Sequence, residues 1–315
     1  MERTGMVNGY IPEERDFTFV SLSEEDMAGM ESSGETSFLR EAFLKFVSKK
    51  GNVAAVIVLM LLVILSLIGP SLSGFVFNEI NTDEMNVVPG VSGHIFGTDA
   101  LGRDMFCRCF RGLRISLFVA VVSTLINVVI GVTLGMISGY FGGAVDMTLQ
   151  RIMDVLGSIP DMVVLTLLIL VLKPGVVTLI FAFILTGWIS MSRIARAETL
   201  RIKEMEFVLA SKTLGAGGFF IVFKNILPNI LGPVISKIMV AIPGTIFMES
   251  ALSVMGLGIS SGEVSLGLLI QSGLLTFFLH PHRLIPPIII MILTIICFNR
   301  LADGLRNAFD PQEVL

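Results

Sequence analysis

The sequence predicts an all-α, polytopic membrane protein with about six transmembrane helices and a short helix in a cytoplasmic loop. Of the 315 residues, 53% are hydrophobic and only 15% are charged, whereas a soluble domain carries about 25% charged residues. Charges are excluded from long blocks, such as the run from Ile115 to Val145, as lipid-spanning helices require. One polar, helix-like stretch, residues 206–229, separates two strongly apolar segments.

The N-terminal region differs from a secretory signal peptide. Roughly fifty mostly polar residues precede the first apolar run, whereas a signal peptide places its apolar core directly after a short basic region. Residues 1–37 are acidic and rich in Ser, Gly and Met, so we expect them to be disordered or loosely docked. Residues 38–50 form an amphipathic lead-in, which we expect to lie on the membrane surface.

Six apolar segments approach the roughly 20 residues that are needed to cross the hydrocarbon core. The predicted spans are about Val53–Ile68, Ile115–Gly139, Leu156–Leu172, Val176–Ser190, Ile230–Met255 and Leu284–Phe298. The tight turn Lys173-Pro174-Gly175 separates the third span from the fourth. The chain is therefore divided into a cytoplasmic tail and lead-in (1–50), a first helix with an extracytoplasmic segment (51–114) and a transmembrane core (115–315).

The distribution of Lys and Arg predicts that both termini are cytoplasmic in a multi-pass protein of the cell membrane, because cytoplasmic loops carry the excess of these residues. The inside segments then hold Arg3, Arg15, Arg40, Lys45, Lys49, Lys50, Arg151, Arg193, Arg196, Arg201, Lys203, Lys212, Lys224, Arg300 and Arg306. The outside segments hold Arg103, Arg108, Arg111, Arg114, Lys173 and Arg283. The cluster Arg103–Arg114 opposes this orientation unless it forms a packed helix with Asp99 and Asp104.

Several classes of function lack support in the sequence. No Gly-x-x-x-x-Gly-Lys-Ser/Thr phosphate loop occurs, and no Ser/His/Asp or His-Glu-x-x-His arrangement stands out. The net charge of −4 favours no nucleic-acid partner, which would need a basic face. His280 with His282, and Cys107 with Cys109, each form an incomplete metal shell. We interpret the two pairs as turn residues and as small residues on a helix near the membrane.

The stretch at 206–229 contains a short helix, a glycine break, an apolar run and a Leu-Pro stop. Such a loop is typical of a surface that receives a soluble protein, because small residues such as Ala210 and Ser211 allow close backbone approach. Gly215 is suited to a positive φ that ends the helix. Pro228 is expected to begin the fifth span, where its missing N–H has no cost. The alternative is an ordinary helix–turn–helix loop that binds nothing.

The same stretch resembles the coupling motif of ABC importer permeases, Glu-Ala-Ala-x3-Gly-x9-Ile-x-Leu-Pro. Matching residues are Ala210, Gly215, Leu227 and Pro228, whereas Leu209 and Asn225 stand where the motif has Glu and Ile. Three further blocks occur in order at 94–117, 138–160 and 299–311. Together they identify residues 90–315 as similar to the C-type permease of dipeptide, oligopeptide and nickel importers. The departures, such as Ser260–Gly267 in place of a Pro-Ser-Trp-Gly turn, lie on the outer side.

The resemblance implies a non-catalytic subunit that forms half of the translocation pathway for di- or oligopeptides. A homologous second permease, two ABC ATPase subunits and an extracytoplasmic binding protein would be its partners. ATP and Mg²⁺ would lie on the ATPases, and this chain would bind no cofactor of its own. The implied ATPase-coupling residues are Glu206, Leu209, Ala210, Ser211, Gly215, Leu227 and Pro228. Alternatives are a permease of the same family for nickel or a metal chelate and, in another class, an ion-coupled secondary transporter; an intramembrane enzyme finds no support.

Charged residues inside a membrane are costly and usually functional. Asp161 begins the third span, and Glu249 lies deep in the fifth, twelve residues from Lys237. Asp161 and Glu249 are therefore candidates for residues that line the translocation path. The competing interpretation of Glu249 is a hydrogen-bonded packing contact. Small residues also permit close helix packing, so the pair Gly131 and Gly135 predicts a contact either inside this chain or with a second permease.

Overall fold

The computed structural model describes residues 35–259 and 262–309. The chain divides into two units, residues 1–44 and 45–315. Helix α2 (Glu35–Ser48) contains the described part of the first unit, so the predicted lead-in is helical, while the predicted tail up to residue 34 lies outside the described residues. All of the features below belong to the second unit.

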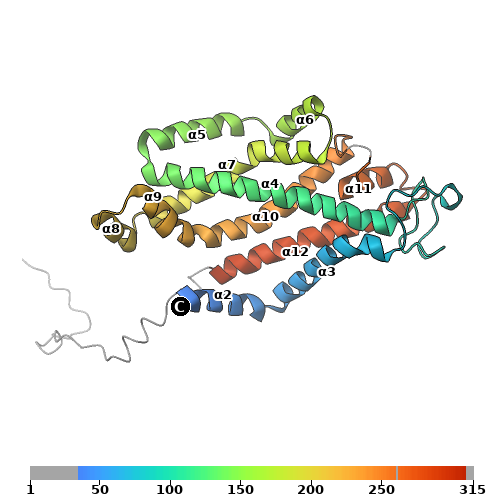
Figure 1. Cartoon of the computed structure of the whole chain (residues 1–315), viewed down its shortest axis with the longest axis horizontal. Helices are drawn as coiled ribbons and strands as arrows, with labels where there is room; N and C mark the ends of the chain where they lie inside the picture. The colour runs from blue at the N-terminus through green and yellow to red at the C-terminus, as the bar shows by residue number, and fades with distance from the viewer. Residues whose placement is uncertain (1–34, 260–261, 310–315) are drawn as a thin grey trace, which may run out of the picture. The chain divides into compact units, whose positions relative to one another are not determined.

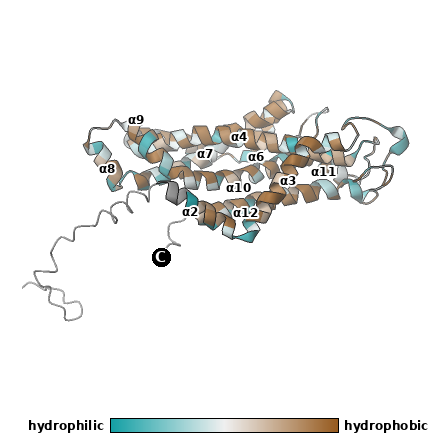
Figure 2. Ribbon diagram, turned by 60° about the horizontal axis from the view of Figure 1, so that its bottom comes forward, coloured by the Kyte–Doolittle hydropathy of each residue, from teal (hydrophilic) through white to brown (hydrophobic). Residues whose placement is uncertain are grey.

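The second unit is built from helices that run side by side (Figure 1) and are apolar over most of their length (Figure 2). The long helices are α3 (Lys50–Leu72), α4 (Met105–Phe141), α7 (Val176–Ile202), α10 (Leu227–Val254) and α12 (Ile285–Phe309). Shorter elements are η2 (Thr82–Glu84), α5 (Gly143–Gly157), α6 (Asp161–Leu172), α8 (Glu206–Thr213), α9 (Gly218–Phe220), η3 (Ile221–Ile226), α11 (Leu266–Leu274) and η4 (Pro281–Arg283). Within the described ranges, five spans are long and apolar enough to cross a membrane, or six if the bent pair α5–α6 counts as one.

The third predicted span is wrong in shape. Instead of one helix over Leu156–Leu172, the chain forms α5 and α6, which meet at an angle of 74°. Pro160 lies at the bend, immediately before α6. Proline has no N–H to donate and disfavours helical geometry in the residue before it, so the apolar periodicity continues while the helix breaks.

Two other predicted boundaries move for local reasons. Helix α4 begins ten residues before the predicted Ile115, because the Asp104 side chain caps it by accepting a 2.6 Å hydrogen bond from the backbone N–H of Cys107. Pro228 lies in the first turn of α10, as predicted, but the apolar span begins earlier, at Gly218, because α9 and the π-helical segment η3 run directly into α10. The wide turn of η3 lets the helix continue past a residue that cannot donate its backbone hydrogen bond.

Helices α4 and α7 make the closest contact in the unit, along glycines spaced four residues apart. A Cβ added to Gly131 would lie 2.5 Å from the carbonyl oxygen of Trp188, and one added to Gly135 would lie 2.3 Å from that of Ser192. Gly139 similarly faces Thr199. The pair Gly131 and Gly135 therefore packs inside this chain, as one of the two predicted alternatives has it.

The segment between α3 and α4 folds as a polar cap that neutralises the arginine cluster. Asp99 pairs with Arg103 at 2.7 Å and with Arg108 at 3.6 Å, and Arg111 pairs with Glu263 at 3.3 Å. The Arg114 guanidinium donates to the backbone carbonyls of Ser66 and Leu67 of α3. These contacts confirm the prediction that the arginine cluster packs within the chain and pairs with Asp99.

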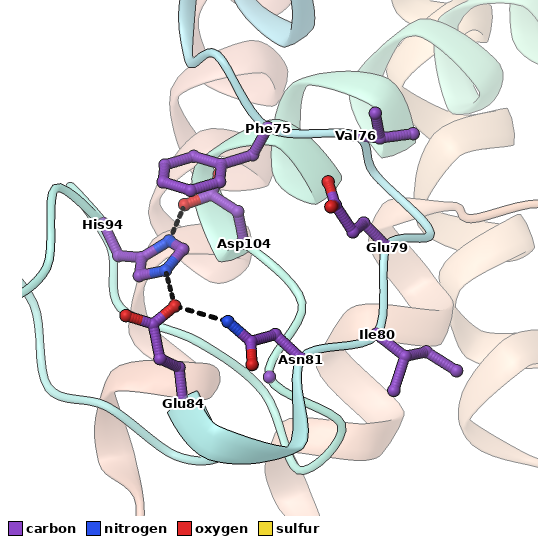
Figure 3. Close-up of a pocket in the computed structure, with 9 residues that line it drawn as sticks. Phe75, Val76, Glu79, Ile80, Asn81, Glu84, His94 and Asp104 are labelled. Atoms are coloured by element: carbon purple, nitrogen blue, oxygen red, sulfur yellow. Dashed lines mark hydrogen bonds and ion pairs between the residues drawn. The ribbon is translucent and has the colours of Figure 1, made fainter.

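Asp104 was expected to pair with this arginine cluster, and the structure corrects that expectation. Its Oδ2 lies 2.8 Å from His94 Nδ1, and Glu84 lies 3.3 Å from the other ring nitrogen (Figure 3). The His94 ring stacks on Phe75 with centroids 4.2 Å apart. These four residues line a hollow of about 170 Å³, and the His94 side chain holds the pKa of Glu84 below its usual range.

The contact between α4 and α7 predicts a strong size limit at Gly135. Gly135→Ala should lower the free energy of unfolding by about 1–3 kcal/mol, because the added methyl group meets backbone and not a flexible side chain. Gly244→Ala in α10 is the matched control, since a Cβ there has no neighbour within 4 Å. Thermal unfolding of both purified variants in detergent measures the effect. Equal stability of the two variants would contradict the packing.

We expect the stability of the protein to depend on pH because of the carboxyl group of Asp99 in the cap. Burial alone would raise the pKa of Asp99, but the hydrogen bond from Arg103 and the charge of Arg108 outweigh it and hold the pKa below its usual range. A carboxyl with a lowered folded-state pKa stabilises fully above the unfolded pKa of about 3.9 and loses that contribution as the pH falls.

Wild type should therefore lose more stability between pH 5 and pH 3 than Asp99→Asn, a window that brackets the unfolded pKa of about 4. Asp99→Asn should also be less stable at pH 7, because Arg108 keeps no ionic partner. Asp83→Asn on the same cap is the control, since Asp83 is exposed. Melting temperatures at the two pH values test this, and equal losses in wild type and Asp99→Asn would refute the role of Asp99.

Candidate coupling surface

Helix α8 lies where α4 and α7 both end (Figure 1). Its Val208 is only 1% exposed and belongs to a buried apolar cluster with Ile221, Val222 and Ile226. The segment η3 therefore supplies part of the floor on which α8 rests, together with residues of α4 and α7 in the same cluster. This single buried residue fixes which face of α8 points inward and leaves the remaining faces open.

Glycine ends α8 as the sequence predicted. Gly215 has a φ of +84° and donates its backbone N–H to the carbonyl of Lys212 at 3.0 Å. The N–H of Ala216 bonds to the carbonyl of Ser211 at 3.1 Å, so the last carbonyls of the helix are satisfied. A Cβ at Gly215 would meet nothing within 4 Å. The requirement for glycine here is conformational and leaves open space beside the turn.

The predicted coupling residues on α8 form an accessible surface. Glu206, Leu209 and Ala210 are exposed, and Leu209 is 49% exposed. Ser211 is half-buried, and its Oγ accepts a 2.7 Å hydrogen bond from Asn225 Nδ2. We define residues 206–215, for which contact with an ATPase is a prediction, as the coupling surface. It combines apolar, small and charged side chains on one short helix and its turn.

The other two predicted coupling residues lie outside this surface. Leu227 is half-buried and packs against the apolar cluster beneath α8. Pro228 is exposed in the first turn of α10. The motif therefore joins two structural roles: its first part forms the coupling surface, and its Leu-Pro end begins the helix that supports this surface.

Three residues of the site escaped the sequence prediction. Asn225 appeared only as a departure from the motif, yet it bonds α8 to η3 through Ser211. Val208 is the anchor of α8, but it lies in the apolar run Phe207–Leu209, where nothing in the sequence separates the buried valine from its exposed neighbours. Leu214, which is 88% exposed beside Gly215, is the most accessible apolar side chain of the surface, and no sequence pattern separates it from a buried leucine.

The two candidates for the translocation path lie in different environments. Glu249 is 1% exposed and accepts hydrogen bonds from Ser116 at 2.9 Å and Ser253 at 3.0 Å, so in this conformation it is a packing contact between α10 and α4. Asp161 is exposed in the first turn of α6, where its charge favours the positive end of the helix dipole. A role of either residue in permeation stays a prediction.

The two residue pairs that were considered for a metal site are His280 with His282 and Cys107 with Cys109. Among the described residues, no group of three His, Cys, Asp or Glu side chains could hold a metal ion. His282 Nε2 lies 3.2 Å from the backbone carbonyl of Thr98, which ties η4 to the cap. Cys107 and Cys109 are both buried free thiols on the packed side of α4.

Comparison with known proteins identifies the family. Residues 131–313 match the family "Binding-protein-dependent transport system inner membrane component", and residues 37–89 match "N-terminal TM domain of oligopeptide transport permease C". The dipeptide transport system permease protein DppC of Bacillus subtilis is 42% identical over 88% of this chain and 86% of its own length. The oligopeptide permease OppC of the same organism is 38% identical over 89% and 92% of the two chains, respectively.

Solved structures agree at the level of the fold. A chain of the inward-facing MetNI methionine ABC transporter matches with a TM-score of 0.54 and 18% identity, over 65% of this chain and 98% of its own length. This likeness shows that the two chains share a fold. The family is shown by the sequence comparisons. The chain therefore belongs to the family of binding-protein-dependent transport system inner membrane components.

Proposed function

We propose that this chain is the permease subunit of an ATP-driven importer and forms half of the translocation pathway for di- or oligopeptides. The observation that carries the proposal is the coupling surface: α8 is held by one buried side chain and presents its other faces outward. The family membership supports a role in binding-protein-dependent transport, and the names of the relatives support peptides as the substrate class. A homologous permease would supply the other half of the pathway.

We propose that the protein lies in the cytoplasmic membrane. In this orientation α8, the N-terminus and the C-terminus are on the cytoplasmic side. At the α8 end three arginines of α7 are paired with acidic side chains, whereas Lys212 and Lys224 have no ion pair among the described residues. At the opposite end, Arg103, Arg108 and Arg111 are engaged with the cap. The unengaged positive charge therefore favours the α8 end as the inner side.

Two ABC ATPases, one on each permease, would bind at the α8 end and hold ATP and Mg²⁺. This chain would contribute no catalytic group. A push on α8 would reach α10 directly, because Val208 packs on η3 and Asn225 bonds to Ser211. Rigid elements with discrete contacts transmit displacement in this way. ATP binding and hydrolysis would thus alternate access to the two sides of the membrane.

An extracytoplasmic binding protein would dock at the opposite end, where the cap closes the bundle, and deliver the peptide. Nickel or a metal chelate is the alternative cargo within the same family. An ion-coupled secondary transporter is the alternative mechanism, and Glu249 would be its candidate ion ligand. That carboxylate is occupied by serine hydroxyls in this conformation, which favours the ATP-driven proposal.

The proposal predicts that Gly215→Trp separates the ATPases from the permease. A tryptophan at this position adds bulk to the coupling surface and strains a residue with a φ of +84°. Pull-down of the tagged full-length chain from native membranes, with protein identification, measures the effect. We expect wild type to retain an ATPase and a second permease, and the variant to lose the ATPase.

Gly175→Trp is the matched control, because Gly175 lies in the turn between α6 and α7 at the far end of α7 and its added Cβ would also meet nothing within 4 Å. It should retain both partners. A chain that is isolated alone from wild-type membranes, or an ATPase that is retained by Gly215→Trp, would overturn the proposal and favour measurements of sodium- or proton-dependent uptake.

A further inference from the structure

A hollow of about 380 Å³ lies beside the coupling surface. We propose that it receives an acidic side chain, with a neighbouring apolar residue, from the partner ATPase, so that the two proteins interlock in both directions. This inference rests on the proposed function, because it assigns a second contact to the same partner. The permease would then accept a part of the ATPase as well as present α8 to it.

The hollow has walls from three parts of the chain. Tyr140 and Phe141 come from the end of α4, Lys203 from the turn after α7, and Leu209 and Lys212 from α8. The two aromatic rings lie edge to face with centroids 5.2 Å apart. Because α4, the turn after α7 and α8 all contribute to its walls, the hollow depends on how α8 sits on the bundle.

One wall is fixed and basic. Lys203 Nζ donates a 3.0 Å hydrogen bond to the carbonyl of Gly139, which joins the turn before α8 to the glycine-lined contact of α4 with α7. This bond holds the ammonium group at the edge of the hollow while leaving its other two protons available. A lysine ammonium has three donors, so a carboxylate can be bound without loss of the bond to Gly139.

The rim carries more positive than negative charge. Lys203 and Lys212 face a single acidic residue, Glu204, and no ion pair joins Lys212 to an acidic side chain in the part of the chain that the structure describes. Opposite charge across an interface favours and orients association. The complement of this rim is therefore a carboxylate.

Part of the lining of the hollow is apolar and suits the side chain beside that carboxylate. This part is lined by Tyr140, Phe141, Val208 and Leu209, of which Leu209 is 49% exposed. Binding energy concentrates where such a pocket takes an anchor residue from the partner. Because Leu209 belongs both to the hollow and to the coupling surface, the partner that covers α8 also covers the hollow.

The test is a charge reversal at the rim in the full-length chain. Lys212→Glu should raise the apparent Kd for the co-purified ATPase, added back to stripped membranes, by about three- to tenfold and flatten its dependence on salt. The Lys212 side chain is exposed and forms no ion pair among the described residues, and its backbone bond to Gly215 does not depend on the side chain, so we expect the fold to be preserved. Lys224→Glu on η3 is the control, since Lys224 is exposed but lies outside the hollow.

A photo-reactive benzophenone residue at Leu209 identifies the occupant independently. We expect it to crosslink an ATPase peptide that contains Asp or Glu next to an apolar residue. Crosslinks to lipid or to this chain alone, or an unchanged affinity of Lys212→Glu, would overturn the inference. If Gly215→Trp still loses the ATPase in that case, only the hollow is misassigned; if Gly215→Trp retains it, the proposed function fails as well.

Discussion

The close contact of α4 with α7 is the constraint on which the rest of the structure depends. In a bilayer, lipid competes with neighbouring helices as an apolar partner, so association relies on backbone approach at small residues. Gly131, Gly135 and Gly139 provide that approach over two turns of α4. The last of these glycines lies directly before Tyr140 and offers its carbonyl to Lys203. The contact therefore sets the positions of the ends of α4 and α7, and through them the place of α8.

Both ends of the bundle hold ion pairs within the chain, but they differ in how many basic side chains remain unpaired. At the cap, guanidinium groups are paired with carboxylates or with free carbonyls of α3, as for Arg103 and Arg114, and they hold the segment between α3 and α4 in one conformation. At the α8 end, lysines such as Lys212 remain unpaired among the described residues. Ion pairs such as Arg196 with Asp146 stabilise the α8 end as well, but in the described part of the chain Lys212 has no ion pair and is available for a partner.

The sequence predicted the helical class, five of the spans and a short helix within residues 206–229 that Gly215 ends, because uncharged runs and a left-handed glycine are local signals. It missed the bend at Pro160 and the early start of α4, because apolar periodicity reports neither a proline break nor a cap. The bond between Asn225 and Ser211 and the hollow beside α8 join residues far apart in the chain. Such features depend on packing, and a single sequence carries no signal for them.

The most direct test of the central claim is labelling of Leu214→Cys by a membrane-impermeant maleimide, since Leu214 is 88% exposed and the three native cysteines are buried. We expect labelling in inside-out vesicles stripped of peripheral proteins, none in right-side-out vesicles, and protection when the ATPases are added back. Ile95→Cys on the cap, which is 55% exposed in wild type, should show the opposite sidedness. Labelling of Leu214→Cys from the outside, or no protection by the ATPases, would contradict the assignment of α8 as the surface through which ATP drives this permease.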